Sequence, residues 1–168
     1  GAVNFPSVGA EVMAVIRPYL DLAEKLGAFQ VQMLSGALQD VTIEYSGELL
    51  NYNVAPITIS LIKGLLDPIL TETVNYINAP VIARERGIKI VESKSTETKD
   101  FTNMISLTVK TSKETGKTAG AVFGQNDPRI VRVNEFSLEI IPEGYMLAVS
   151  NEDMPGVIGN LGTTLGDN

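Results

Sequence analysis

The hydrophobic residues of this sequence change their spacing lastingly near residue 88, and this change constrains the fold more than any other feature. Before it, apart from an alternating segment at residues 38–46, apolar residues recur every three or four positions, which is the period of a helix with one buried face. After it, apolar and polar residues alternate, as in a β-strand. The order predicts an α+β domain, with helices packed on one face of a mixed, largely antiparallel sheet.

The joint between the two halves is predicted to be a short helix, a turn and a strand. Asn78 is a suitable N-cap, and Pro80 falls in the first helical turn, where the missing N–H would have no partner anyway. Gly87 follows a charged run and predicts a left-handed helix stop. Alternation over residues 88–94 then indicates the strand.

The first helix is predicted to begin at Ser7 or Gly9 and to end at Gly27. Pro18 should bend or split it, because proline removes one backbone donor and clashes with the preceding turn. Residues 29–34 are either its tail or the approach to a strand. The predicted buried stripe comprises Val8, Val12, Val15, Ile16, Tyr19, Leu22, Ala23 and Leu26. Three charged residues are assigned to a solvated face: Asp21, Glu24 and Lys25.

Two more helices are predicted before the joint. Asn53 and Pro56 open the first, and Asp67 with Pro68 reads as the cap and first residue of the second. The inward residues should be Ile57, Leu61, Ile62 and Leu65 in one helix, and Leu70, Val74 and Ile77 in the other. This part of the sequence is unusually apolar, which indicates a buried helix pair or an oligomer contact.

Short alternating segments separated by polar turns predict the strands. They span residues 38–46, 88–94, 101–111, 117–124, 129–133, 137–141 and 145–150. After residue 143 the character changes again. Residues 144–168 read as a strand, a turn containing Pro155 and a helix, with Val157, Ile158, Leu161 and Leu165 at helical spacing. We therefore predict one domain at residues 1–143 and part of a second at 144–168.

The composition excludes several classes of function. The 168 residues include no cysteine and no histidine, so thiol nucleophiles, disulfides, zinc–thiolate sites and imidazole bases are ruled out. A formal net charge of -7 argues against nucleic acid or an anionic membrane as partner. We find no membrane span or signal peptide and expect a cytoplasmic protein. Lacking an initiator methionine, the sequence reads as a piece of a longer chain.

The sequence shows no group of residues suited to catalysis, a cofactor or a metal. No Gly-x-Gly-x-x-Gly follows a predicted strand, so no dinucleotide site is expected. The three glycines between residues 116 and 124 open no helix and do not predict a phosphate cradle. The carboxylates near the predicted domain boundary are interpreted as surface charge: Glu139, Glu143, Glu152 and Asp153.

Arg129 and Arg132 are the candidate anion ligands. They lie three positions apart on one predicted strand and should therefore face opposite sides of the sheet. At most one of them could then point into a given pocket. A surface or ion-pair role for Arg129 is the alternative.

Three stretches of the sequence resemble one known family. They are the opening Ala2-Val3-Asn4-Phe5-Pro6-Ser7, the joint with its Asn78-Ala79-Pro80 and Gly87-Ile88, and residues 119–134. They occur in the family's order and cover nearly the whole chain. The sequence resembles the intervening domain of D-3-phosphoglycerate dehydrogenase, also called the allosteric substrate-binding domain, which some serine dehydratases share.

The resemblance implies a non-catalytic regulatory and assembly region of an NAD-dependent enzyme. That enzyme would oxidise 3-phosphoglycerate to 3-phosphohydroxypyruvate in L-serine synthesis, with the nicotinamide and the catalytic residues upstream. The implied partners are further copies of the chain, the upstream catalytic domains and a small anionic or amino-acid effector. A regulatory region of an L-serine dehydratase and a purely structural dimerisation module are the alternatives.

The resemblance also implies where effectors would bind. Residues 144–168 resemble the opening of an ACT domain, in which Asn151 and Asp153 fall where the family binds serine. Arg129 matches a basic residue of the family's anion or substrate site between subunits. Ile141 stands where some members carry a second basic residue.

Overall fold

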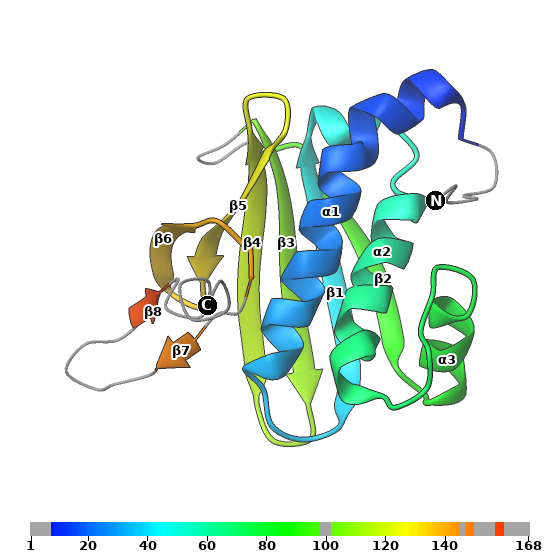
Figure 1. The fold of residues 1–168 in the computed structure, drawn as a ribbon, viewed down its shortest axis with the longest axis vertical. Coiled ribbons are helices and arrows are strands. Elements are labelled where there is room, and N and C mark those ends of the chain that lie inside the picture. Colours follow the sequence, from blue (N-terminus) through cyan, green and yellow to red (C-terminus); the bar gives the residue numbers. More distant parts are fainter. Residues whose placement is uncertain (1–7, 98–101, 145–146, 150–156, 160–168) are drawn as a thin grey trace.

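A computed structural model describes residues 8–97, 102–144, 147–149 and 157–159. Within these ranges, helices lie against a six-stranded sheet, and two further strands pair with each other (Figure 1). The helices are α1 (Ala10–Gln32), η1 (Glu48–Asn51), α2 (Ala55–Leu66), η2 (Asp67–Ile69) and α3 (Ala79–Glu85). The strands are β1 (Leu38–Gly47), β2 (Lys89–Ser95), β3 (Asn103–Thr111), β4 (Thr115–Phe123), β5 (Asp127–Val133), β6 (Phe136–Ile140), β7 (Leu147–Val149) and β8 (Val157–Gly159).

The large sheet is mixed, as predicted, and has the order β2-β1-β3-β4-β5-β6. β1 and β2 run parallel, with Val41 opposite Ile90, and every other neighbouring pair is antiparallel. Parallel strands need a crossover connection, and the helical segment from η1 to α3 supplies it. From β3 onward the chain forms a meander joined by short turns. The predicted α+β class is confirmed.

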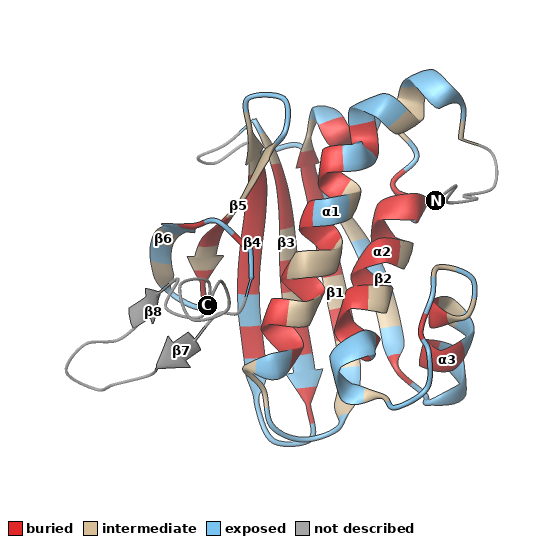
Figure 2. Ribbon diagram, in the orientation of Figure 1, coloured by how far each residue is buried: buried red, intermediate tan, exposed pale blue. Residues whose placement is uncertain are grey.

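The helices cover one face of the sheet. α1 and α2 lie side by side in front of it in Figure 1, and Figure 2 shows buried residues concentrated where they meet the strands. The two helix backbones touch, because a methyl group on Gly64 would overlap the backbone oxygen of Glu24, and one on Gly27 would lie 2.5 Å from the backbone oxygen of Leu61. Two glycines therefore set the distance between the helices.

α1 differs from its prediction in two respects. It continues past Gly27 to Gln32, so residues 29–32 are helix tail, and Gly27 serves helix contact rather than helix termination. The helix is bent but not split, although Pro18 lies inside it (Figure 1). The buried stripe is confirmed from Ile16 onward, whereas Val15 remains 46% exposed.

The third predicted helix is mostly absent. η2 ends at Ile69, and of the residues expected to face inward, Val74 is buried but Ile77 is 80% exposed. The backbone N–H groups of Ile77 and Asn78 donate to the side-chain oxygen of Asn75, and the N–H of Asn75 donates to that of Asn78. These local bonds compete with helical ones and hold a turn instead.

The joint after this turn matches its prediction in part. α3 begins directly after Asn78, but the Asn78 side chain makes no cap bond to the helix, because it is engaged in the turn. Gly87 has a φ of 71°, the left-handed stop that was predicted. β2 follows within one residue of its predicted start.

The C-terminal segment departs from prediction where the structure describes it. β7 pairs antiparallel with β8, so Val157–Gly159 is a strand and the expected helix start there is wrong. β-branched Val157 and Ile158 next to Gly156 and Gly159 favour extended backbone over helix. The other residues of the expected helix lie outside the described residues. The domain boundary after residue 143 stays a prediction.

Candidate functional site

Arg129 and Arg132 lie on the same face of the sheet, which corrects the expectation that they point to opposite sides. On the neighbouring β4, Arg129 pairs with Ala121 and Arg132 with Ala119, two residues that share one face of a strand. The register shifts between these pairs, so Val131 is the extra residue of a β-bulge. A bulge resets the two-residue period, and side chains three positions apart then point the same way.

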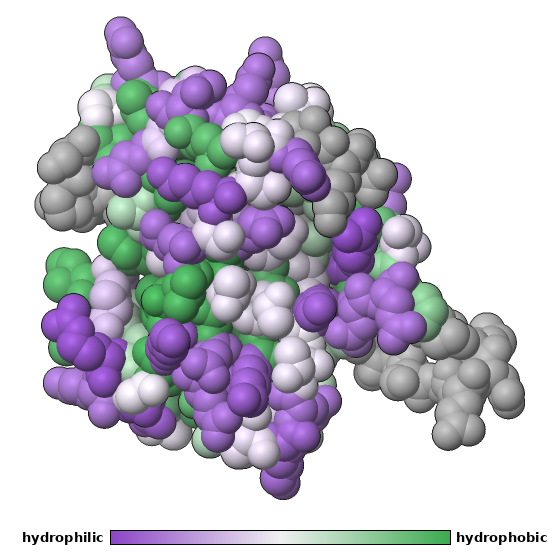
Figure 3. All heavy atoms as spheres, turned by 180° about the vertical axis from the view of Figure 1, so that it is seen from behind, coloured by the Kyte–Doolittle hydropathy of each residue, from purple (hydrophilic) through white to green (hydrophobic). Residues whose placement is uncertain are grey.

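This shared face is the one that the helices leave open. Gly120 lies between the two alanines on β4 and faces the helices, because a methyl group there would meet the side chain of Leu22 in α1. Its neighbours on β4 must therefore face away. Figure 3 shows this side of the molecule, where hydrophobic side chains form separate patches between hydrophilic ones.

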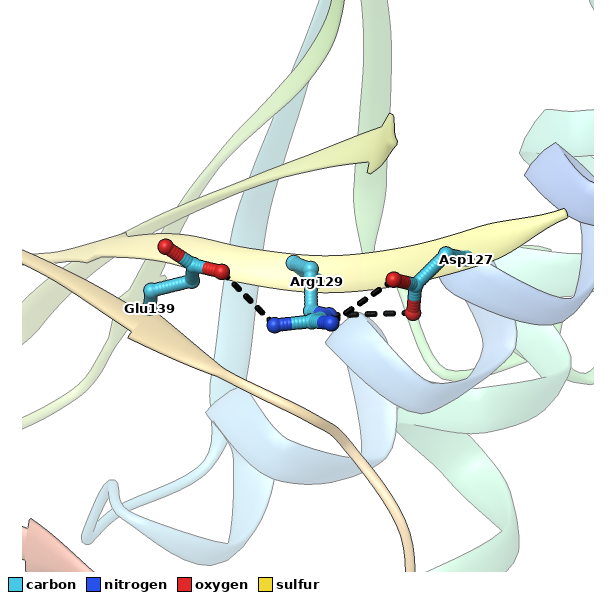
Figure 4. A network of polar contacts seen from close by, with 3 residues as sticks. All are labelled: Asp127, Arg129 and Glu139. Carbon is cyan, nitrogen blue, oxygen red and sulfur yellow. Dashed lines mark hydrogen bonds and ion pairs between the residues drawn. The ribbon is translucent and has the colours of Figure 1, made fainter. Parts of the chain in front are cut away.

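The guanidinium of Arg129 is held by two carboxylates (Figure 4). Its Nε and one terminal nitrogen donate to the two oxygens of Asp127 at 3.0 and 2.7 Å, and its other terminal nitrogen donates to Glu139 at 2.7 Å. The guanidinium also lies 5.6 Å from the ring centre of Phe123. Planar two-point binding of this kind is the strong form of an Arg–carboxylate pair.

These contacts shift the titration of both partners. The hydrogen bond from Arg129 lowers the pKa of Asp127 below its ordinary value of 3.8, and the same bond, with weaker help from Glu139 and Glu143, raises the pKa of Arg129. The positive charge is thus already compensated by this chain. An anionic ligand would compete with these carboxylates for Arg129, and Glu139, whose side chain is 54% exposed against 48% for Asp127, is the slightly more accessible one.

Of the other predicted site residues, Arg132 and Ile141 lie among those that the structure describes. Arg132 is half-buried and lies opposite Ser137 of β6, and Ile141 is exposed just beyond that strand. Asn151, Asp153 and Glu152 lie outside the described residues. The roles predicted for these residues, and the anion role of Arg129, therefore stay predictions.

Two polar networks on the helix side escaped the sequence analysis. Thr58 of α2 donates to Glu92 of β2 at 2.6 Å, so the buried Tyr45 hydroxyl, 2.7 Å from Thr58, must be the donor to that residue. Burial is the main reason that the pKa of Tyr45 is raised. This chain of hydrogen bonds joins β1, α2 and β2. The sequence analysis did not predict it, because single hydroxyl groups within apolar segments do not change the hydrophobic periodicity.

The second network corrects the assignment of Glu24 to a solvated face. Glu24 forms an ion pair with Lys63 of α2 and accepts a hydrogen bond of 2.8 Å from the Tyr76 hydroxyl. Lys63 also lies 5.4 Å from the ring centre of Tyr76. Burial, followed by the hydrogen bond to Glu24, raises the pKa of Tyr76 to about 12. The network fastens the turn before α3 to both long helices.

Among the described residues, no Gly-x-Gly-x-x-Gly turn joins a strand to a helix. The nearest approach to a strand–glycine–helix turn is Gly47, which precedes η1. A methyl group on Gly47 would overlap the backbone of Thr102, so this glycine allows two segments of the chain to pack closely. Among the residues that the structure describes, no group of three or more acidic side chains is placed to hold a metal ion, and no helix is long and apolar enough to cross a membrane.

The fold and its contacts thus define a two-layer α+β module whose polar networks join its own elements. The chain belongs to the D-3-phosphoglycerate dehydrogenase intervening domain family, whose sequence model matches residues 15–134. It is 39% identical over 98% of its length to a D-3-phosphoglycerate dehydrogenase of Synechocystis sp. and, equally, to one of Methanocaldococcus jannaschii. It is 34% identical over 99% of its length to one of Bacillus subtilis. The chain spans 30%, 31% and 32% of these three relatives.

Proposed function

We propose that this chain is a regulatory and assembly region of an NAD-dependent D-3-phosphoglycerate dehydrogenase that works in cytoplasmic L-serine synthesis. The observation that carries the proposal is the family match over residues 15–134, with similarity to relatives of that name along 98% of the chain. The oxidation of 3-phosphoglycerate and the nicotinamide would belong to other parts of the enzyme. The lack of histidine in this sequence supports that division.

Assembly is the first part of the role. A two-layer domain leaves one face of its sheet without helices, and here that face carries the charged row of Arg129, Asp127 and Glu139. Such a surface suits contacts with further copies of the chain or with the catalytic domains. A following ACT domain, of which residues 144–168 would be the opening, would then be positioned by this module.

Regulation by an anion is the second part. A phosphate or carboxylate group of the substrate would replace Glu139 on Arg129, and the contact that joins β5 to β6 would open. An effector acts only through unequal affinity for two arrangements of the protein, and this exchange would supply two arrangements. A purely structural module is the competing function, favoured by the fact that Arg129 is already paired with two carboxylates.

Calorimetric titration of the 168-residue chain with 3-phosphohydroxypyruvate, inorganic phosphate and serine separates these functions. The regulatory proposal expects saturable binding of the first ligand, lost in Arg129→Ala and retained in Arg84→Ala, an exposed arginine of α3. Absence of binding by all three ligands would leave the structural module. Sedimentation of the same samples tests assembly, because a monomer at all concentrations would contradict contacts between copies of this region.

A further inference from the structure

A cavity lies at the end of the molecule where α1 ends and β1 begins, at the bottom of Figure 1. Its volume is about 220 Å³, and its walls come from the end of α1, the turn into β1, η2 and the α3–β2 joint. The lining combines aliphatic side chains with polar groups of comparable exposed area, and the aliphatic ones are Val31, Leu34, Leu38, Ile69 and Ile88. It is far in sequence from Arg129 and shares no residue with that cluster.

The wall formed by the turn into β1 is held in shape without a ligand. Gly36 has a φ of 94°, and a methyl group on it would lie 2.7 Å from the Ser112 hydroxyl. Ser112 in turn accepts the N–H of Ala37, and its own N–H donates to the oxygen of Ala37. The hydroxyl of Thr111 donates to the oxygen of Ser35. The cavity is therefore preformed, as ligand sites generally are.

The helix ends around the cavity leave few polar groups unsatisfied. At the end of α1, the carbonyls of Gln30 and Val31 accept N–H groups from Met33 and Leu34. At the end of α3, the carbonyls of Ile82, Ala83 and Arg84 accept N–H groups from Arg86, Ile88 and Gly87. Glu114, a carboxylate close in sequence to the lining residue Thr111, accepts the N–H of Ser35. These groups therefore compete little for a ligand.

Arg86 is the charged residue of the lining. It is exposed, and it takes part in none of the ion pairs among the described residues, unlike Arg129 with its two carboxylates. A guanidinium beside an aliphatic hollow suits a ligand with one anionic group and a short apolar body. At roughly 30 Å³ for each water-sized group, the cavity holds about seven of them.

We propose that this cavity binds a small branched aliphatic carboxylate, with its carboxylate on Arg86 and its methyl groups against Leu34, Ile69 and Ile88. Ligand binding here would join η2 and the α3–β2 joint to the end of α1. The site is independent of the proposed role of Arg129. In this proposal the α3–β2 joint is part of a ligand site as well as a connection between the helical layer and the sheet.

The test uses isovalerate, which has one carboxylate and a branched four-carbon body, and the uncharged isovaleramide as its matched probe. Amide resonances of the 168-residue chain are followed by NMR during each titration. We expect saturable shifts at Val31, Leu38 and Ile88 with isovalerate, and binding of the amide weaker by about tenfold or more. Arg86→Gln should weaken isovalerate binding to the level of the amide, whereas Arg84→Gln and Arg129→Ala should leave it unchanged.

Three results would each overturn the proposal: no saturable shifts with isovalerate, shifts that persist in Arg86→Gln, or equal binding of acid and amide. Leu34→Trp is a second variant, because the indole should fill the cavity and abolish binding while Arg86 stays in place. Isovalerate that still binds to this variant would place the ligand elsewhere. The spectrum of each variant without ligand shows whether it is folded.

Discussion

The two faces of the large sheet are built on different principles. On the helix face, Gly27 and Gly64 bring two backbones into contact over an aliphatic core in which buried polar side chains are few. On the other face, a small buried cluster of Met104, Ala119, Ala121 and Val131 lies beside Arg129 and its carboxylates. The helix face therefore stabilises the fold through close packing, whereas the open face presents charged side chains that another molecule can contact.

The largest effect should come from enlarging a glycine at the helix contact. Gly64→Ala places a methyl group against the backbone of Glu24, which cannot move without shifting α1, and should lower the free energy of unfolding by about 3 kcal/mol. Urea denaturation measures it. Gly9→Ala is the control, because nothing lies within 4 Å of that position and it should cost under about 1 kcal/mol. Equal losses would mean that the helices are not packed backbone to backbone.

A buried hydroxyl should matter more than an open one of the same type. Thr58→Val removes the group that links Tyr45 to Glu92 and leaves a buried phenol without its acceptor, which should cost about 1–3 kcal/mol. Thr108→Val, on the open face, should change the free energy of unfolding by less than about 0.5 kcal/mol. Thermal and urea denaturation of both variants test this difference. A loss of stability in Thr108→Val as large as that in Thr58→Val would contradict the prediction.

The Tyr76 network should make stability fall in alkali. The folded-state pKa of about 12 lies above the ordinary 10.0, so the folded chain keeps a proton that the unfolded chain loses. The resulting stabilisation is complete below pH 10.0 and is lost as the pH rises toward about 12. Tyr76→Phe should flatten the stability curve in that window. An unchanged slope, measured by urea denaturation across the window, would show that Tyr76 ionises normally.

The smallest effect is expected on the open face. Because the pKa of Asp127 is lowered, its contribution to stability is present above pH 3.8 and is lost as the pH falls below that value. The melting temperature of Asp127→Asn should lie slightly below that of the parent near neutral pH and should meet it in acid. High salt should also close the gap, since exposed ion pairs are screened. A gap that survives both changes would indicate a role other than the pair with Arg129.

The sequence predicted those features of the fold that follow from periodicity. The switch of period at residue 88 placed the helices, the strands and the α+β class, and the stop at Gly87 was recognised because glycine is suited to a positive φ. Predictions from periodicity were wrong where a bulge or local side-chain hydrogen bonds changed the direction of the backbone. The bulge at Val131 turned Arg132 to the side of Arg129, and the side-chain bonds between Asn75 and Asn78 replaced a predicted helix.

The candidate sites were harder to predict, because they depend on contacts between distant residues. Arg129 could be chosen from the sequence, but its two carboxylates could not, since the partner Glu139 is fixed by the pairing of β5 with β6. The cavity at Arg86 is built from segments that are distant along the chain, from Val31 to Thr111. No single stretch of sequence contains a signal for such a site.

The position of β1 has a consequence for the order of folding. Its partners β2 and β3 are both distant in sequence, whereas β3 to β6 are joined by short turns. Closing long loops is slow, so the meander should acquire protected amides first, and β1 should join it later together with its edge partner β2. Pulsed hydrogen exchange during refolding should therefore protect Leu107 and Thr118 before Val41 and Ile43. The parallel pair would then be the step that commits the chain to its native state.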